Sequence, residues 1–252
     1  MAVENNLSIV HLSDIHVGAK LEREKLERAV EEINELNPDL VVVTGDLTEE
    51  GLLEEFQEAQ RYLQKLKCKR LVVGSGNHDA RNTGYRLFPH FFGKPWSITE
   101  IGDAVLIMLD SSRPDQDGGE VGYRQRLWLR ECLENYHDKF KIVAMHHHLL
   151  PAPDTGMEKN MIVDAGDVLW TLVSHGVNLV LCGHRHRPWV WKLGSLSIVY
   201  AGAVSTSRLR GFYQNSYNII KIENGKVDVE LKIVGGGEYV FEPSVIKTLQ
   251  TV

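Results

Sequence analysis

Aspartate, asparagine and histidine residues collect just after the apolar runs of this sequence, where parallel strands would end. Nine side chains share this placement: Asp14, His16, Asp46, Asn77, His78, Asp79, His146, His184 and His186. The last two flank Arg185, and residues two apart on an extended chain face the same side. Carboxylates, imidazoles and one amide carbonyl, without thiolates, suit ions such as manganese, iron, zinc, cobalt or nickel. The residue types therefore indicate a metal site.

The number of candidate ligands bears on how many ions could bind. Because His184 and His186 would face the same side of an extended chain, these two residues alone could share one ion. Counting along the whole chain gives seven candidates: Asp14, His16, Asp46, Asn77, His146, His184 and His186. Seven side chains are too many for a four-coordinate ion that keeps an open position. They are enough for two ions that share one bridging carboxylate.

The elements that must position these side chains follow from the apolar pattern. In the first half, short apolar runs predict buried strands at 8–12, 40–43 and 71–73, and amphipathic stretches predict helices over 26–36 and 52–66. This βαβαβ order implies a parallel sheet with right-handed crossovers. The carboxyl ends of its strands then meet at one edge, which is where open α/β sheets bind ligands.

The pattern of strands changes along the rest of the chain. Further buried strands are expected at 104–109, 140–145 and 177–182, with helices near 123–135 and 165–175. After Pro188, strands without intervening helices are expected at 189–193, 196–200, 217–222 and 227–233. These predict a mixed second sheet packed on the first. We expect a single domain over 1–252, with its core at about 7–222 and the C-terminal hairpin strands and tail reaching 252.

Composition places the chain among soluble globular proteins. Its 252 residues are 43% hydrophobic and 25% charged, which fits one large domain. The net charge of -6 creates no global positive field, so duplex DNA and anionic membranes are not expected partners. The apolar runs are shorter than the roughly 20 residues that span a bilayer. The first residues lack the features of a signal peptide, and the three cysteines form no CxxC pair, so a cytoplasmic location is expected.

The ordered motifs resemble the signature of the calcineurin-like metallophosphoesterases. The fragments D-x-H, G-D, G-N-H-D, H and G-H-x-H occur in this order, and the resemblance covers roughly residues 7–222. It implies an α/β fold, a four-layer αββα sandwich of two mixed β-sheets flanked by helices. It also implies two divalent or trivalent metal ions, with manganese or iron favoured over zinc, cobalt or nickel.

The resemblance also implies a role for each motif residue. Asp14, His16 and His186 would bind one ion, Asn77, His146 and His184 the other, and Asp46 would bridge them. His78 would donate a hydrogen bond to a phosphate oxygen or protonate the leaving group, and Asp79 would orient its imidazole. Because three histidines follow one another at 146–148, His147 is the alternative ligand to His146.

The implied reaction is the hydrolysis of a phosphoester. Two ions about 3.5–4 Å apart can hold a bridging hydroxide near neutral pH, because metal binding lowers the pKa of water by many units. That hydroxide would attack phosphorus in line while both ions neutralise charge on the other oxygens. No covalent enzyme intermediate is required.

The choice of substrate rests on the loops. The polar loops 111–122 and 147–164 should overhang the metal edge, and loops of this length in a compact domain are often functional. One part of the sequence is similar to the branch of this superfamily that includes the bacterial class III cyclic-nucleotide phosphodiesterases. It consists of residues 109–112, a glycine-rich loop, and then Gln125 with residues 128–129. It implies a small phosphodiester substrate, with 3′,5′-cyclic AMP as a candidate.

Several alternatives stay open at this point. Within the hydrolases, a phosphomonoesterase or a single-strand nuclease of the same superfamily is the main alternative. A catalytically inactive scaffold for protein binding is a second class, although seven converging polar side chains argue for metal binding. Arg113, Arg208 and Arg210 are candidates for contacting a phosphate or a base, and apolar surface patches could support a homodimer. A dinucleotide site is not expected, because G-x-G-x-x-G needs glycine where Asp79 stands.

Overall fold

The short apolar runs become the inner strands of two six-stranded sheets. The computed structural model describes residues 6–156, 160–210 and 213–240. Its helices are α1 (Arg23–Leu36), α2 (Leu53–Leu63), α3 (Gly84–Phe92), α4 (Tyr123–Asn135) and α5 (Ala165–Ser174). Its strands are β1 (Asn6–Leu12), β2 (Leu40–Val43), β3 (Arg70–Val73), β4 (Ser97–Ile101), β5 (Ala104–Met108), β6 (Phe140–Ala144), β7 (Leu179–Cys182), β8 (Trp189–Leu193), β9 (Leu196–Tyr200), β10 (Ser216–Glu223), β11 (Lys226–Ile233) and β12 (Glu238–Val240).

The first sheet combines a parallel and an antiparallel half. Its strand order is β12-β11-β10-β1-β2-β3. The strands β1, β2 and β3 are parallel, with Val10 opposite Val41 and Val41 opposite Leu71. On the other side of β1, strand β10 runs antiparallel and places Ile219 opposite Val10. The strand β1 is therefore central, and the N-terminal and C-terminal parts of the chain meet on it.

The second sheet has a parallel centre with an antiparallel strand at each edge. Its strand order is β4-β5-β6-β7-β9-β8. The strands β5, β6, β7 and β9 are parallel, while β4 pairs antiparallel with β5 and β8 pairs antiparallel with β9. Both sheets are mixed, as expected.

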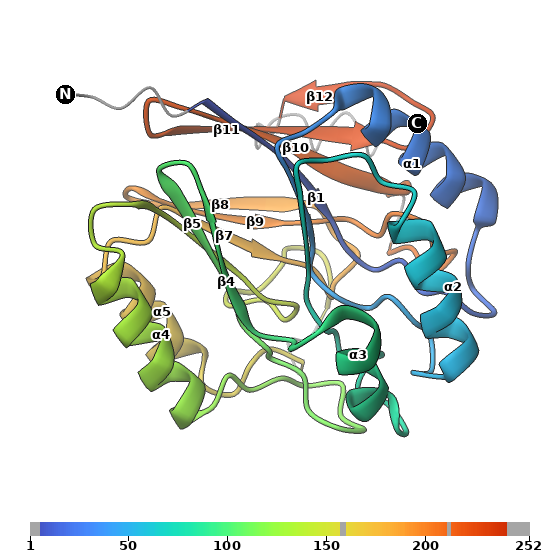
Figure 1. Ribbon diagram of the computed structural model, residues 1–252, viewed down its shortest axis with the longest axis horizontal. Helices are drawn as coiled ribbons and strands as arrows, with labels where there is room; N and C mark the ends of the chain where they lie inside the picture. Colours follow the sequence, from blue (N-terminus) through green and yellow to red (C-terminus); the bar gives the residue numbers. More distant parts are fainter. Residues whose placement is uncertain (1–5, 157–159, 211–212, 241–252) are drawn as a thin grey trace.

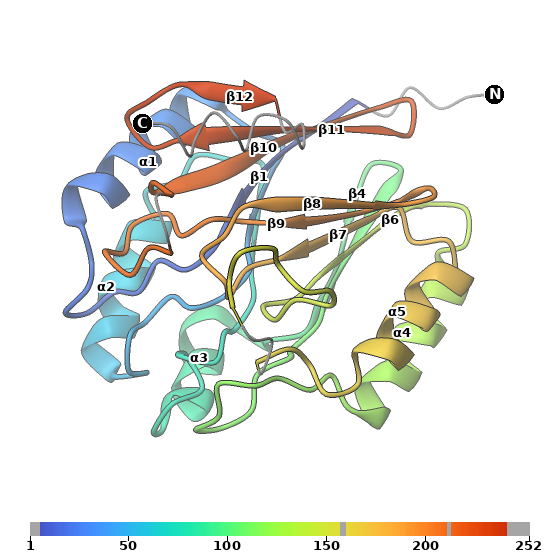
Figure 2. The ribbon, with the colours of Figure 1, turned by 180° about the vertical axis from the view of Figure 1, so that it is seen from behind.

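The side chains of the inner strands alternate between two apolar layers. Ile9 and Val42 point into the core between the two sheets, where they meet Leu106 and Leu181. Their neighbours on the strands point outward and pack under α1, α2 and α3 on the first sheet, and under α4 and α5 on the second. Figure 1 shows the two groups of helices on opposite outer faces, and Figure 2 shows the same order of layers from behind. The fold is a four-layer αββα sandwich.

Two differences separate this fold from the sequence expectations. The strands after Pro188 do not form a sheet of their own: β8 and β9 extend the sheet that holds β5 to β7, and β10 to β12 extend the sheet that holds β1 to β3. The elements α3, β4 and β12 were not predicted. The tail after residue 240 lies outside the described residues. None of the helices in the described ranges is both long and apolar enough to cross a membrane.

Candidate metal centre

Both sheets contribute side chains to one buried site. Asp14 and His16 follow β1, Asp46 follows β2 and Asn77 follows β3 in the first sheet; His146 follows β6, and His184 and His186 follow β7 in the second. The two sets meet directly, since the backbone N–H of His184 donates to Asp14 Oδ2 at 3.1 Å. All seven residues are at most 8% exposed. The carboxyl ends of strands from two sheets therefore form the site together.

The backbone turns sharply at these strand ends. Asp14, His16, Asp46, His184 and His186 have φ of 57°, 53°, 52°, 72° and 52°, which lies in the left-handed region. Residues with a Cβ adopt this region at a cost, and such residues cluster where a function needs them. Here five of the seven candidate ligands lie at such turns, directly after the strands that carry them.

Glycine residues beside the ligands allow this close packing. A Cβ on Gly76 would lie 2.1 Å from Asp46 Oδ1, and a Cβ on Gly183 would lie 1.8 Å from Ser13 Oγ. Real Cβ atoms do not approach other atoms that closely. The glycines of the G-N-H-D and G-H-x-H motifs therefore let neighbouring loops come together around the polar side chains.

One group of ligand atoms gathers around the end of β1. Asp14 Oδ1 lies 3.1 Å from His186 Nε2, which in turn lies 3.1 Å from His16 Nε2. His16 Nε2 lies 3.6 Å from Asp46 Oδ2. One atom from each of these four residues lies within 4.8 Å of the others, which is close enough to hold a single ion.

A second group lies on the other side of Asp46. His146 Nε2 is 3.3 Å from Asp46 Oδ2 and 3.0 Å from Asn77 Oδ1. His184 Nδ1 is 2.9 Å from Asn77 Oδ1 and 3.2 Å from His146 Nε2. Asp46, His146 and His184 again keep their ligand atoms within 4.8 Å. The carboxylate of Asp46 thus belongs to both groups.

Backbone carbonyls orient the imidazoles. His146 Nδ1 donates to Thr44 O at 2.7 Å, and His186 Nδ1 donates to Arg208 O. Because a carbonyl can only accept, the hydrogen is assigned to Nδ1 and Nε2 presents a lone pair to the site. Asp14 Oδ1 is buried and has no hydrogen-bonding partner among the described residues, although His186 Nε2 is near it. Lone pairs that face one another repel, and a cation between them removes this repulsion. This set of donor atoms therefore fits metal binding.

Burial and mutual charge set the ionisation of the site. Burial opposes ionisation of Asp46, but His146 and His78 outweigh it and hold the pKa of that carboxyl well below its usual range. Burial lowers the pKa of His184 well below its usual value, and the neighbouring imidazoles of His147 and His146 lower it further. The ionised carboxylate of Asp46 and the neutral imidazole of His184 are forms that bind metal ions. Burial opposes protonation of His146, but the Asp46 carboxylate outweighs it and raises the pKa of His146 to about 9, so a bound ion would replace a proton there.

The structure places His146, and not His147, in the second group of ligand atoms. His147 Nδ1 lies 2.9 Å from Ser111 Oγ, and its Nε2 lies 3.1 Å from Asp117 O. Both ring nitrogens of His147 are therefore engaged with the loop 111–122. Ligation by His146 stays our prediction.

His78 and Asp79 make separate contacts in the structure. His78 Nδ1 lies 2.6 Å from Glu49 O, and its Nε2 lies 3.3 Å from Arg208 Nη1. The carboxylate of Asp79 instead accepts hydrogen bonds from Leu47 N, Thr48 N, Thr48 Oγ1 and Gly76 N at 2.8–3.2 Å. Asp79 thus joins the loops that follow β2 and β3, and its hydrogen bonds in the described part of the chain do not include the His78 ring. Its expected role in orienting His78 stays a prediction.

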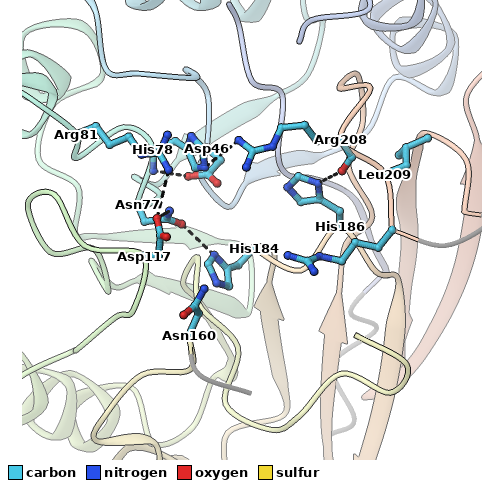
Figure 3. Close-up of a pocket in the computed structure, with 11 residues that line it drawn as sticks. Asp46, Asn77, His78, Arg81, Asp117, Asn160, His184, His186, Arg208 and Leu209 are labelled. Atoms are coloured by element: carbon cyan, nitrogen blue, oxygen red, sulfur yellow. Dashed lines mark hydrogen bonds and ion pairs between the residues drawn. The ribbon is translucent and has the colours of Figure 1, made fainter. Parts of the chain in front are cut away.

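A cavity of about 310 Å³ opens above the ligand atoms. Five predicted site residues line it, together with Arg81, Asp117, Asn160, Arg208, Leu209 and Arg210 (Figure 3). Asp117 and Asn160 come from the two loops that the sequence singled out. Arg208 and Arg210 are in the lining, as expected, whereas Arg113 is not and lies 3.7 Å from Glu120 in an ion pair.

Sequence reasoning missed Arg81 and Glu49. Arg81 lines the cavity and pairs with Glu50 and Asp117 at 3.0 and 3.2 Å. Glu49 lies 3.0 Å from His16 and 2.8 Å from Arg208. Their positions just after the G-D and G-N-H-D motifs were the available signals, because a loop at the end of a parallel strand faces the same edge as the ligands.

The fold and this cluster define a metal-dependent phosphoesterase. A model of the calcineurin-like phosphoesterase family matches residues 7–188. The chain belongs to that family, and it is a phosphoric ester hydrolase. The family is metal-dependent, and the clustered aspartates and histidines could bind the metal.

Known proteins of similar sequence carry names of cyclic-nucleotide phosphodiesterases. A 3′,5′-cyclic adenosine monophosphate phosphodiesterase, CpdA, of Pseudomonas aeruginosa is 26% identical over 211 residues, which cover 79% of this chain and 76% of that protein. A probable cyclic nucleotide phosphodiesterase of Vesicomyosocius okutanii is 22% identical over 202 residues, covering 77% and 84%. The fold is similar to that of the purple acid phosphatase PPD1 from yellow lupin, with a TM-score of 0.74 and 14% identity over 96% of this chain and 53% of that one.

Proposed function

We propose that this protein is a dinuclear metal-dependent phosphodiesterase that acts on small phosphodiesters, with 3′,5′-cyclic nucleotides as the leading candidates. The observation that carries the proposal is the position of Asp46. Its carboxylate belongs to two groups of ligand atoms at the floor of one cavity. The names of the relatives support the diester class.

The buried residues divide between two proposed ions. Asp14, His16, Asp46 and His186 would hold the first, and Asp46, Asn77, His146 and His184 the second. Ions bound there would lower the pKa of water and neutralise charge on a phosphate. The Thr44 and Arg208 carbonyls hold His146 and His186 with Nε2 turned inward, so the chain presets two of the ligand directions.

His78 is the proposed proton donor to the leaving oxygen. Its ring lines the cavity, and Nδ1 faces the carbonyl of Glu49. Nδ1 would donate to that carbonyl, and Nε2 would be the atom that carries the proton to the leaving oxygen. The guanidinium groups of Arg81, Arg208 and Arg210 line the cavity and offer N–H donors to a phosphate.

A panel assay tests this proposal. Protein freed of metal by a chelator is given manganese, iron or zinc, and hydrolysis is measured with cyclic AMP, bis-p-nitrophenyl phosphate, p-nitrophenyl phosphate and single-stranded DNA. We expect diester hydrolysis only with metal, and its loss in Asp46→Asn. Preference for the monoester would overturn the substrate class. Neither metal binding nor hydrolysis would favour an inactive scaffold.

A further inference from the structure

Arg208 links the wall of the cavity to a carboxylate beneath it. Its Nη1 donates to Glu49 Oε1 at 2.8 Å and lies 3.3 Å from His78 Nε2. The side chain of Arg208 is 41% exposed, whereas that of Glu49 is 12% exposed. One side of the guanidinium group therefore contacts Glu49, and another side faces the cavity. Figure 3 shows Arg208 beside His78 and Asp46.

The second oxygen of Glu49 faces a proposed metal ligand. Glu49 Oε2 lies 3.0 Å from His16 Nδ1, on the side of the ring opposite the other ligand atoms. Neither of these two buried atoms has a hydrogen-bonding partner elsewhere in the described part of the chain. A carboxylate at the outer nitrogen of an imidazole fixes the ring and makes the inner nitrogen a better ligand. Glu49 is placed to do this for His16.

The loop that carries Arg208 also holds the other histidine of the same group. The carbonyl of Arg208 accepts from His186 Nδ1, and its N–H donates to Thr206 Oγ1 at 3.2 Å. One residue thus contacts His186 through its backbone and reaches His16 through Glu49. This loop lies between β9 and β10, far in sequence from the loop that follows β2.

We propose that Glu49 is a positioning residue for His16 and that Arg208 binds the phosphate of the substrate with the guanidinium donors that Glu49 leaves free. The inference rests on the proposed function. An Arg guanidinium has five N–H donors in a fixed fork, so it can keep Glu49 and still present donors to an oxyanion. A lysine has one ammonium group and cannot reach both with the same geometry.

Two titrations test the two halves of this proposal. In the first, Mn²⁺ is added to metal-free protein and binding is followed by calorimetry. Glu49→Gln should weaken one of two binding steps by roughly 10–100-fold and leave the other unchanged. In the second, inorganic phosphate is used as a competitive inhibitor of bis-p-nitrophenyl phosphate hydrolysis. Arg208→Ala should raise its inhibition constant by about 10–100-fold with the Mn²⁺ content unchanged, and Arg208→Lys should recover only part of this.

An exposed ion pair of the same kind supplies the control. Arg113 and Glu120 lie 3.7 Å apart on loop 111–122 and do not line the cavity. Arg113→Ala and Glu120→Gln should leave both titrations unchanged. Wild-type Mn²⁺ affinity in Glu49→Gln, or a wild-type phosphate inhibition constant in Arg208→Ala, would overturn the corresponding half. A wild-type protein that neither binds Mn²⁺ nor hydrolyses the diester would instead count against the proposed function.

Discussion

Replacement of Asp79 should damage the fold more than it damages proton transfer. Its buried carboxylate accepts four hydrogen bonds, two on Oδ1 from Thr48 and two on Oδ2 from Leu47 and Gly76. An asparagine has one amide oxygen, so Asp79→Asn can keep one pair and turns an NH₂ group toward the other. Two buried donors without partners cost about 2–4 kcal/mol, and Asp79→Ala, which leaves four, should cost about 4 kcal/mol or more. Burial and the nearby Asp46 carboxylate raise the pKa of Asp79 to about 6, so removal of the charge offsets part of this cost above that pH, and the comparison is made near pH 4.

Urea unfolding in the presence of a chelator measures this cost without a contribution from metal binding. Both variants should also bind Mn²⁺ less well, because Leu47 and Gly76 directly follow and precede the proposed ligands Asp46 and Asn77. Asp115 provides a matched control: its exposed carboxylate accepts one hydrogen bond from Asn82 N. Asp115→Asn keeps an acceptor for Asn82 N and tolerates the φ of 56° at this position, so it should change the free energy of unfolding by no more than about 0.5 kcal/mol.

The competing interpretation gives the opposite result. If Asp79 acted by orienting the His78 imidazole, Asp79→Ala would unfold like the wild type and share the kinetic defect of His78→Ala. A loss of less than about 1 kcal/mol, together with that shared defect, would refute the assignment of Asp79 as a link between the two loops.

Three further predictions concern the same edge of the sheets. His184→Ala and His186→Ala should each lose a different ion, so elemental analysis should find about one ion per chain in each; loss of both ions from either variant would contradict the division of ligands. His78→Ala should keep its metal and lose roughly 10²–10⁴-fold in kcat on a diester with a poor leaving group; an unchanged kcat would remove His78 from the reaction. Burial raises the pKa of the half-buried Asp110 to about 6, above its unfolded value of 3.8. The folded protein therefore favours the neutral carboxyl group, and the free energy of unfolding falls as the pH rises from about 4 through 6 and the group ionises. Asp110→Asn should therefore gain up to about 3 kcal/mol relative to wild type between pH 4 and pH 7.5 in paired urea titrations, and a constant difference would contradict the shift.

The convergence of the proposed ligands could be predicted from the sequence. The apolar runs mark the ends of β1, β2, β3, β6 and β7, and in parallel sheets these ends face one edge. Because motif residues stand directly after these runs, their convergence followed without knowledge of the packing. Their roles as ligands remain predictions, which the metal analyses above address.

Other parts depend on contacts that periodicity does not encode. The helix α3 contains Pro89, and β4 is an edge strand whose residues are half-buried or exposed, so neither gives a strong pattern. The pair formed by Glu49 and Arg208 joins residues 159 positions apart, and nothing local to either one indicates it. The strands after Pro188 have similar patterns, and only tertiary packing decides which sheet each one joins.

The central place of β1 in the first sheet has a consequence for synthesis on the ribosome. One edge of β1 pairs with β2, which is synthesised soon after it. The other edge pairs with β10, which begins only at Ser216. Until then a nascent chain of more than 200 residues exposes an unpaired apolar strand, a template for pairing with other chains. Expression fragments that stop before residue 216 should therefore aggregate, and those that extend through β11 should remain dispersed.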